Sequence, residues 1–220
     1  KITKALEELR NEKKRKFVQT VDLVVNLKNF DVRKEALNTF VTVPHPREKK
    51  IAAFLPKRSP SIDTITEEDF VKYKETKDIK KLAKQYDAFI AVAPLMGKIA
   101  TKFGRVFGPI GRMPSPQAGI IPVFSEEALL AMRDKVQKVI RVRNKEMAIK
   151  LPIGSEDMSD SDLAENILEV LRGLEKKLPR GKDNIKQVLI KFTMTKPFHS
   201  ISTVAALPSE GRRRSNASSE

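Results

Sequence analysis

The chain has 220 residues, with 43 Lys and Arg against 28 Asp and Glu, a formal charge of +15 and no cysteine. The lack of cysteine excludes disulfides, thiol catalysis and cysteine-ligated zinc, and the two histidines, His45 and His199, are too far apart in sequence to indicate a metal site. The positive charge predicts a polyanionic partner, for which nucleic acid is the commonest choice.

An anionic membrane surface is the rival partner, but no segment shows a basic amphipathic helix with bulky apolar residues on its other face. The longest apolar run, residues 89–96, is broken by Pro94 and falls short of the roughly 18 residues that span a bilayer. The N-terminal residues lack the apolar core of a secretory signal. We therefore expect a cytoplasmic protein with no membrane partner, no metal and no cofactor.

The first third of the chain predicts one helix and two strands. Apolar residues at helical spacing predict a helix over residues 2–13. Alternation predicts a strand over residues 17–27, and its parity places Phe17 on the apolar face, in the core. A second strand is expected over residues 39–43, ended by the proline that follows.

The middle of the chain predicts alternating strands and helices. Apolar runs predict strands at residues 51–55, 87–93 and 120–124, and periodic segments predict helices at 77–85, 95–103 and 125–135. Ser125 is expected to cap the last of these helices. Residues 104–119, rich in glycine and proline, are expected to form a loop. This alternation predicts a small parallel sheet in a Rossmann-like, three-layer α/β arrangement.

The last third returns to alternation. Residues 139–143 and 147–153 are expected to pair as a hairpin, and residues 185–194 are expected to form a final strand. The segment from Ser159 to Asp162 resembles a capping box, and it opens a helix with a clear apolar stripe.

The two ends of the chain therefore predict a split domain. Residues 1–46 and 138–200 form one α+β domain in this interpretation, and residues 47–137 form an α/β domain inserted into it. Residues 201–220 contain few large apolar side chains and three consecutive arginines, which predicts a disordered basic tail.

No pattern in the sequence indicates catalysis. The glycine-rich segment 104–119 lacks both dinucleotide-binding spacing and a Gly-Lys-Ser/Thr phosphate loop, so we interpret it as a tight turn whose Arg105 and Arg112 could contact RNA phosphates. Acidic pairs such as Glu67-Glu68 have no histidine or metal partner nearby in sequence and are interpreted as caps or solvated faces. We expect a protein that is not an enzyme, with a nucleotide-binding α/β enzyme as the weakest alternative.

The basic cluster before the first strand indicates RNA binding more directly. The Lys-Arg-Lys segment at residues 14–16 can neutralise phosphates. The polar face of the strand can set Thr20 and Asp22 against the sugar hydroxyls that RNA alone supplies. Phe17 could stack on a nucleotide, although its parity favours the core.

Four motifs occur in order along residues 1–198: 15–23 (RKFVQTVDL), 31–34 (DVRK) with 43–45 (VPH), 107–116 (FGPIGRMPSP) and 193–197 (TMTKP). Together they resemble the stalk protein of the large ribosomal subunit, the L-one family, in its archaeal or eukaryotic form.

The resemblance implies two domains, with the second inserted into the first. It implies that the split domain binds a folded segment of large-subunit ribosomal RNA in the mobile stalk. It also implies contact with deacylated tRNA at the exit site, whose release the stalk assists, and in some members repression of translation of the protein's own messenger RNA. The RNA-binding residues predicted from pattern and resemblance together are Lys14, Arg15, Lys16, Phe17, Thr20, Asp22, Arg33, Lys34, Thr193, Met194, Thr195 and Lys196.

Two residues, Pro46 and Thr195, depart from the family pattern, which has glycine at both positions. Glycine at these positions would allow close backbone approach or a positive φ, so its loss affects the expected geometry of the RNA contact. The sequence also leaves the RNA partner open, because a non-ribosomal RNA-binding translational regulator on the same scaffold is the alternative.

Overall fold

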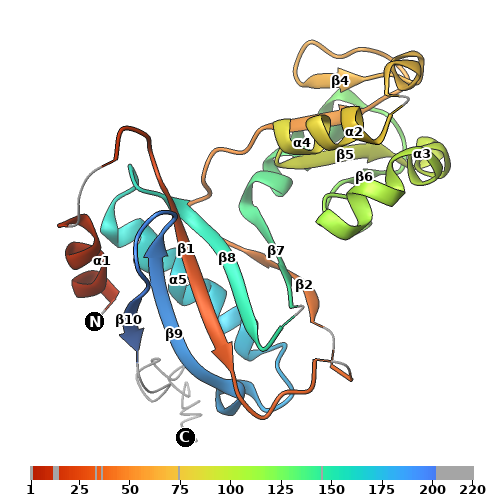
Figure 1. Ribbon diagram of the computed structural model, residues 1–220. Helices are drawn as coiled ribbons and strands as arrows, with labels where there is room; N and C mark the ends of the chain where they lie inside the picture. Colours follow the sequence, from red (N-terminus) through yellow and green to blue (C-terminus); the bar gives the residue numbers. More distant parts are fainter. Residues whose placement is uncertain are drawn as a thin grey trace, which may run out of the picture.

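The computed structural model describes residues 2–11, 15–32, 34–35, 37–73, 75–144 and 146–201, with the backbone only at 198–201. Figure 1 shows two bodies joined by two chain segments. One body combines the two ends of the chain, and the other contains the middle. The chain is therefore a two-domain α/β protein in which one body interrupts the other, as the sequence predicted.

The elements follow the predicted order closely. The helices are α1 (Ile2–Arg10), α2 (Thr76–Gln85), α3 (Met96–Ile110), α4 (Glu126–Lys138) and α5 (Asp160–Glu175). The strands are β1 (Thr20–Leu27), β2 (Asn38–Thr42), β3 (Ile51–Phe54), β4 (Asp63–Ile65), β5 (Ala88–Val92), β6 (Ile120–Ile121), β7 (Val139–Arg143), β8 (Ala148–Ser155), β9 (Ile185–Phe192) and β10 (Phe198–Ile201). Short 3-10 helices occupy Glu68–Lys72, Ala93–Leu95 and Gly181–Asn184. Strands β4 and β10 were not predicted.

The split body is built on an antiparallel sheet of order β10-β9-β1-β8. Along β1 the odd-numbered residues from Val21 to Leu27 are buried, and the even-numbered residues are half-exposed. Helix α5 packs its apolar stripe, which includes Leu163 and Val170, into the same core, and α1 contributes Leu6 and Leu9. The buried side chains of β1, which alternate along the strand, and those of α5, which follow the helical period, therefore pack together in one hydrophobic layer.

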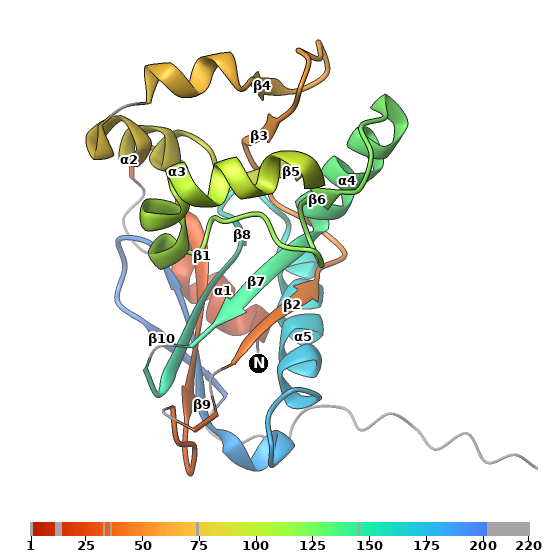
Figure 2. The same cartoon turned by 90° about the vertical axis from the view of Figure 1, so that its right-hand side faces the viewer.

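The expected hairpin between residues 139–143 and 147–153 is wrong. Strand β7 pairs with β2, with Phe40 opposite Arg141, whereas β8 pairs with β1, with Leu23 opposite Leu151. Figure 2 shows β2 and β7 side by side. Alternation correctly indicated both strands, but it reports which face is buried and not which strand is the partner.

The inserted body has the predicted three layers. Its parallel sheet has the order β4-β3-β5-β6, with α2 and α3 packed on one face and α4 on the other. Phenylalanine rings fill the first interface, with a centroid separation of 5.3 Å between Phe54 and Phe103 and of 4.5 Å between Phe89 and Phe107. Strands buried on both faces explain the continuous apolar runs in the sequence.

Helix α3 is longer than predicted, because the segment expected to be a loop from residue 104 stays helical to Ile110. Phe103, Val106 and Phe107 are buried at helical spacing. Burial of these side chains outweighs the low helix propensity of the intervening glycines. Gly111, with φ of 81°, ends the helix in the left-handed conformation that glycine adopts most readily.

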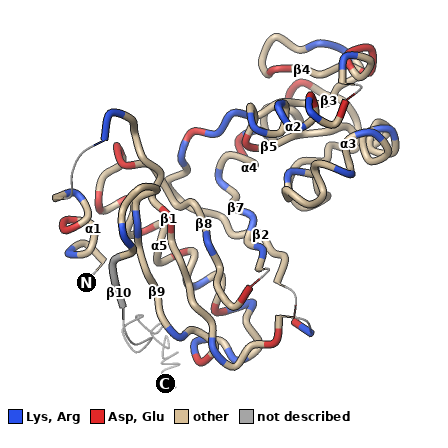
Figure 3. The backbone as a smooth tube through the Cα atoms, viewed as in Figure 1, with Lys and Arg blue, Asp and Glu red and all other residues tan. Residues whose placement is uncertain are grey.

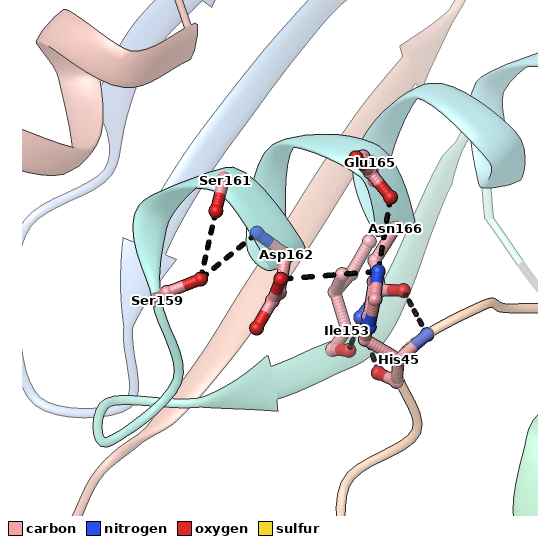
Figure 4. Close-up of polar contacts among 7 residues, drawn as sticks. All are labelled: His45, Ile153, Ser159, Ser161, Asp162, Glu165 and Asn166. Atoms are coloured by element: carbon pink, nitrogen blue, oxygen red, sulfur yellow. Dashed lines mark hydrogen bonds and ion pairs between the residues drawn. The ribbon is translucent and has the colours of Figure 1, made fainter.

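Both predicted N-cap residues lie at the N-cap position of their helix, but only one of them makes a capping hydrogen bond. At the start of α5, the Ser159 side chain accepts a hydrogen bond from the Asp162 amide at 3.2 Å (Figure 4). Ser125 precedes α4 in an extended conformation, but its side chain makes no capping hydrogen bond.

The two chain segments that connect the bodies are fastened by hydrogen bonds. The Lys49 amide donates to Gln137 Oε1 at 3.0 Å, and Gln137 Nε2 donates back to the Lys49 carbonyl at 2.9 Å, so the first segment is tied to the last turn of α4. On the first segment, the amide of His45 donates to Asn166 Oδ1 at 3.0 Å, and Asn166 Nδ2 donates to the His45 carbonyl at 2.5 Å. Figure 4 shows Asn166 reaching from α5 to this backbone.

Candidate RNA-binding surface

One end of the antiparallel sheet brings most of the predicted RNA-binding residues together. Because β1 and β9 are antiparallel, Thr20 at the start of β1 lies beside Thr193, just after β9 ends. The Thr193 amide donates to the Thr20 carbonyl at 3.1 Å, and the Thr20 amide donates to Thr193 Oγ1 at 3.3 Å. Residues 15–20 and 193–196 thus form one surface, called the strand-end surface below.

A buried glutamine fixes the backbone of this surface. Gln19 is 2% exposed, and its Oε1 accepts a hydrogen bond from the Met194 amide at 3.2 Å. The backbone amide of Gln19 donates to the Glu156 carboxylate at 3.1 Å, and Arg10 Nη1 donates to the Glu156 carbonyl at 3.0 Å. Hydrogen bonds therefore join α1, β1 and the segments after β8 and β9 into a rigid support.

Three large apolar side chains are exposed on the strand-end surface. Phe17, Val18 and Met194 are 54%, 56% and 58% exposed. The prediction that Phe17 lies in the core is wrong, because β1 begins only at Thr20 and residues 16–17 form a bend before it. Exposed apolar side chains in this position can stack on bases or pack on ribose faces.

Cations flank these apolar side chains. Residues 15–16 and Lys196 are exposed, and Figure 3 shows the basic segment in blue ahead of β1. On the outward face of the sheet, Asp22 lies opposite Lys191 of β9. Burial raises the pKa of the Asp22 carboxyl, while the positive charges of Lys191 and Arg47 act in the opposite direction. The strand-end surface therefore offers phosphate-neutralising cations, and the adjoining face of the sheet offers one half-buried acceptor for a sugar hydroxyl.

Thr195 fills the position where the family pattern has glycine without adopting a positive φ. Asn29 is the sole non-glycine residue with a positive φ in the described part of the chain. The Thr195 hydroxyl accepts a hydrogen bond from the Phe192 amide at 3.0 Å, and its own amide donates to the Phe192 carbonyl at 3.1 Å. The hydroxyl thus closes a turn after β9, so threonine stabilises the strand end from within the protein.

Not every predicted residue joins the strand-end surface. Lys34 follows the end of β1 opposite to Thr20, and this eight-residue strand spans about 26 Å at roughly 3.3 Å per residue. Lys14 and Arg33 lie outside the described residues. Sequence reasoning missed Gln19 and Glu156, because a glutamine and a glutamate near strand ends give no signal that they support a surface.

Residues 9–196 match the model of a family described as the Ribosomal protein L1p/L10e family. This chain belongs to that family. Relatives named large ribosomal subunit protein uL1 are similar along most of their length. They include proteins of Nanoarchaeum equitans (37% identity over 86% of this chain and 94% of the relative), Thermococcus kodakarensis (38%, 88% and 94%) and Archaeoglobus fulgidus (36%, 88% and 94%). The resemblance drawn from the motifs is therefore confirmed.

As a member of the L1p/L10e family, the chain is a structural ribosomal protein and not an enzyme. Its glycine-rich segment is the end of α3 and the turn after it, rather than a phosphate loop. Arg105 is exposed on α3, whereas Arg112 lines a cavity between the two bodies. Within the described ranges, no helix combines the length and apolar character needed to cross a bilayer, and no three His, Asp or Glu side chains are arranged to hold a metal.

Proposed function

We propose that this L1p/L10e family member is the uL1 protein of the large ribosomal subunit and binds a folded segment of ribosomal RNA through the strand-end surface. The observation that carries the proposal is the exposure of Phe17 and Met194 on a hydrogen-bonded strand end with cations on its flanks. Binding depends on shape, phosphates and 2′-hydroxyls more than on bases, because the bases of helical RNA are poorly accessible. The protein then resides on the ribosome, in the cytoplasm.

The proposed interface assigns a role to each group. Arg15, Lys16 and Lys196 neutralise phosphates, Thr193 and Asp22 meet sugar hydroxyls, and the exposed apolar side chains pack on unstacked bases or riboses. Lys14, next to this cluster in sequence, extends the basic flank. Arg33 and Lys34 remain proposed RNA contacts on the segment between β1 and β2.

The test is a filter-binding titration with large-subunit ribosomal RNA. We expect the double variant Phe17→Ser, Met194→Ser to bind about tenfold to a hundredfold more weakly, since each stacked base is worth roughly 1–3 kcal/mol. The matched control is Met147→Ser, which removes a methionine that is 49% exposed at the start of β8, away from this surface. Equal affinities of all three proteins would refute the proposed interface.

We also propose that the split body alone carries the main RNA site, with boundaries at residues 1–46 and 138–200 around an insertion of 47–137. The separation of the hydrophobic cores supports this division. One core draws on residues 5–43 and 140–192, and the two cores of the inserted body draw on residues 51–136. A chain in which a short linker replaces residues 47–137 is expected to keep most of its affinity for the ribosomal RNA.

Two finer roles follow from the family resemblance and belong to the same proposal: contact with deacylated tRNA leaving the ribosome, and repression of the protein's own messenger RNA. Competition of each RNA against the ribosomal RNA on the filter ranks them. The alternative, a translational regulator outside the ribosome, predicts stronger binding to messenger RNA and no co-sedimentation with large subunits. Co-sedimentation that survives washing at moderate salt would exclude it.

A further inference from the structure

A cavity of about 310 Å³ lies between the two bodies. Residues of β2, β7 and β8 line it from the split body, and the end of α3 with the following turn lines it from the inserted body. At about 30 Å³ per water molecule it has room for about ten waters. That volume is ample for a tetrahedral oxyanion and its remaining hydration.

The charges that line this cavity are unbalanced. Among its described lining residues are four cations, Arg47, Lys49, Arg112 and Arg141, and a single carboxylate, Asp87. Asp87 is already engaged, because its Oδ1 accepts a hydrogen bond from Arg47 Nη2 at 3.1 Å and its Oδ2 accepts one from the backbone amide of residue 50 at 3.3 Å. Three positive charges therefore remain.

Neutral groups hold two of these three cations in place. Lys49 Nζ donates to backbone carbonyls within residues 136–139 at 2.7–3.0 Å. Arg141 Nη1 donates to the Gly111 carbonyl at 2.8 Å, and its Nε donates to Asn38 Oδ1 at 3.1 Å. Carbonyl oxygens satisfy the donors and fix their positions, but they do not neutralise the charge.

Arg112 is the third cation, and its Nη1 is buried without an acceptor among the described residues. A buried donor left without a partner costs free energy, so such groups in native proteins usually have a specific reason. The lowered pKa values of the other two cations also indicate that positive charge in the cavity is not neutralised. Burial, followed by the charge of Arg47, lowers the pKa of Lys49 to about 8, and burial with the charge of Arg143 lowers the pKa of Arg141.

We propose that the cavity between the two bodies is a binding site for a phosphate group or a similar oxyanion, with Arg112 as its main ligand and Lys49 and Arg141 as the surrounding positive charge. The planar fork of an arginine matches two oxygens of a phosphate. Apolar walls that include Phe89 and Met113 strengthen the attraction by lowering the local dielectric. Since the three cations come from the inserted body, a linker and the split body, the bound anion fastens the bodies together.

The first experiment is a calorimetric titration of the full chain with sulfate, a phosphate analogue whose charge is constant near pH 8, at fixed ionic strength in chloride. We expect saturable binding that Arg112→Gln weakens about tenfold or more, as for the loss of a charged hydrogen bond. The matched control is Arg105→Gln, which removes an exposed arginine from α3, the helix that precedes Arg112, and leaves the affinity unchanged. If Arg112→Gln does not fold, Arg112→Lys replaces it, and its sulfate affinity is expected to lie between those of the parent chain and Arg112→Gln.

A second readout separates this cavity from other basic patches on the chain. An anion beside Lys49 raises the pKa of that ammonium, so sulfate binding at pH 8 takes up a fraction of a proton. Arg47, Asp87, Arg112 and Arg141 are the charged groups that line the cavity with Lys49, whose pKa of about 8 lies at this pH. Heats measured in two buffers of different ionisation enthalpy report the uptake. Unchanged sulfate affinity in Arg112→Gln, or binding without proton uptake, overturns the proposal.

The phosphate can belong to a free anion or to RNA, and a further titration distinguishes these sources. If RNA supplies it, Arg112→Gln also weakens binding of the ribosomal RNA; if a free anion supplies it, the RNA affinity stays the same. Either result supports the site once sulfate binding has been shown. The sulfate titration needs no RNA, so it fails or succeeds independently of the proposed RNA-binding function.

Discussion

Replacement of Asn166 by leucine tests how the first linker is fastened to the split body. Asn166 is fully buried in α5, with 0% exposure, and its side-chain amide bonds both the amide and the carbonyl of His45. Its Nδ2 also lies 3.3 Å from the Ile153 carbonyl of β8. Leucine has the same number of side-chain heavy atoms, branched at the same position, so the change removes the hydrogen bonds while leaving little empty space.

The expected loss in the free energy of unfolding follows from the groups left behind. Two backbone polar groups of His45 lose their partner, at about 1–3 kcal/mol for each group that stays buried. His45 is only partly buried, so water can replace part of the loss. The apolar leucine side chain recovers some free energy through burial. We therefore expect a net destabilisation of about 2–4 kcal/mol.

Urea unfolding followed by circular dichroism measures this loss in the variant and in the parent chain. Ser161→Ala is the control, because Ser161 is exposed on the same helix and its hydroxyl bonds only the Ser159 hydroxyl, at 2.9 Å, among the described residues. We expect the control to change stability by about 0.5 kcal/mol or less. If Asn166→Leu lowers the free energy of unfolding by less than about 1 kcal/mol, water forms hydrogen bonds with the His45 backbone as well as the Asn166 side chain does.

Four further outcomes follow from the same structure. RNA affinity should fall with salt, with a log–log slope of about −0.7 to −0.9 per neutralised phosphate, and a flat salt titration would contradict a phosphate-rich interface. Phe17→Ala should weaken RNA binding while leaving the urea midpoint nearly unchanged, because the ring is 54% exposed, and a large stability loss would place it in the core instead. Thr195→Gly should lower stability by about 0.5–1.5 kcal/mol and weaken RNA binding, because the hydroxyl that holds the Phe192 amide is lost; tighter RNA binding would show that threonine obstructs the contact. The pKa of Lys49 is lowered to about 8 in the folded chain, so between pH 8 and the ordinary lysine pKa the unfolded chain binds more protons than the folded chain. The free energy of unfolding should therefore rise with pH across that window relative to the Lys49→Met variant. Parallel pH profiles of the two proteins would contradict the shift.

The periodicity of the sequence was enough to predict most helices and strands. The buried face of β1, the apolar stripe of α5 and the doubly buried strands of the inserted body were all apparent in the pattern. The motifs also placed the predicted RNA-binding residues at both chain ends, and antiparallel pairing of β1 with β9 brings most of them to one surface. These features were predictable because burial on one face leaves a local period in the chain.

The errors concern properties that depend on distant residues. Parity placed Phe17 in the core, but the point at which a strand begins depends on its partner strands, and here pairing starts at Thr20. Glycines predicted a loop after residue 103, but aromatic side chains from β3 and β5 provide a core that keeps α3 helical through Phe107. Local propensities are worth about 1 kcal/mol per glycine, less than burial of a single large side chain.

The sequence by itself determined the fold class, the interrupted order of the chain, the family and a set of basic and apolar residues predicted to bind RNA. Only the tertiary structure decided that β7 pairs with β2 and that Arg112 lines a cavity between two bodies. It also decided that Asn166, on an apolar helix face, forms hydrogen bonds with the backbone of His45, which lies 121 positions away in the chain. The physical reason is that periodicity records whether a side chain is buried, whereas its partners are set by contacts that close long loops and leave no period in the chain.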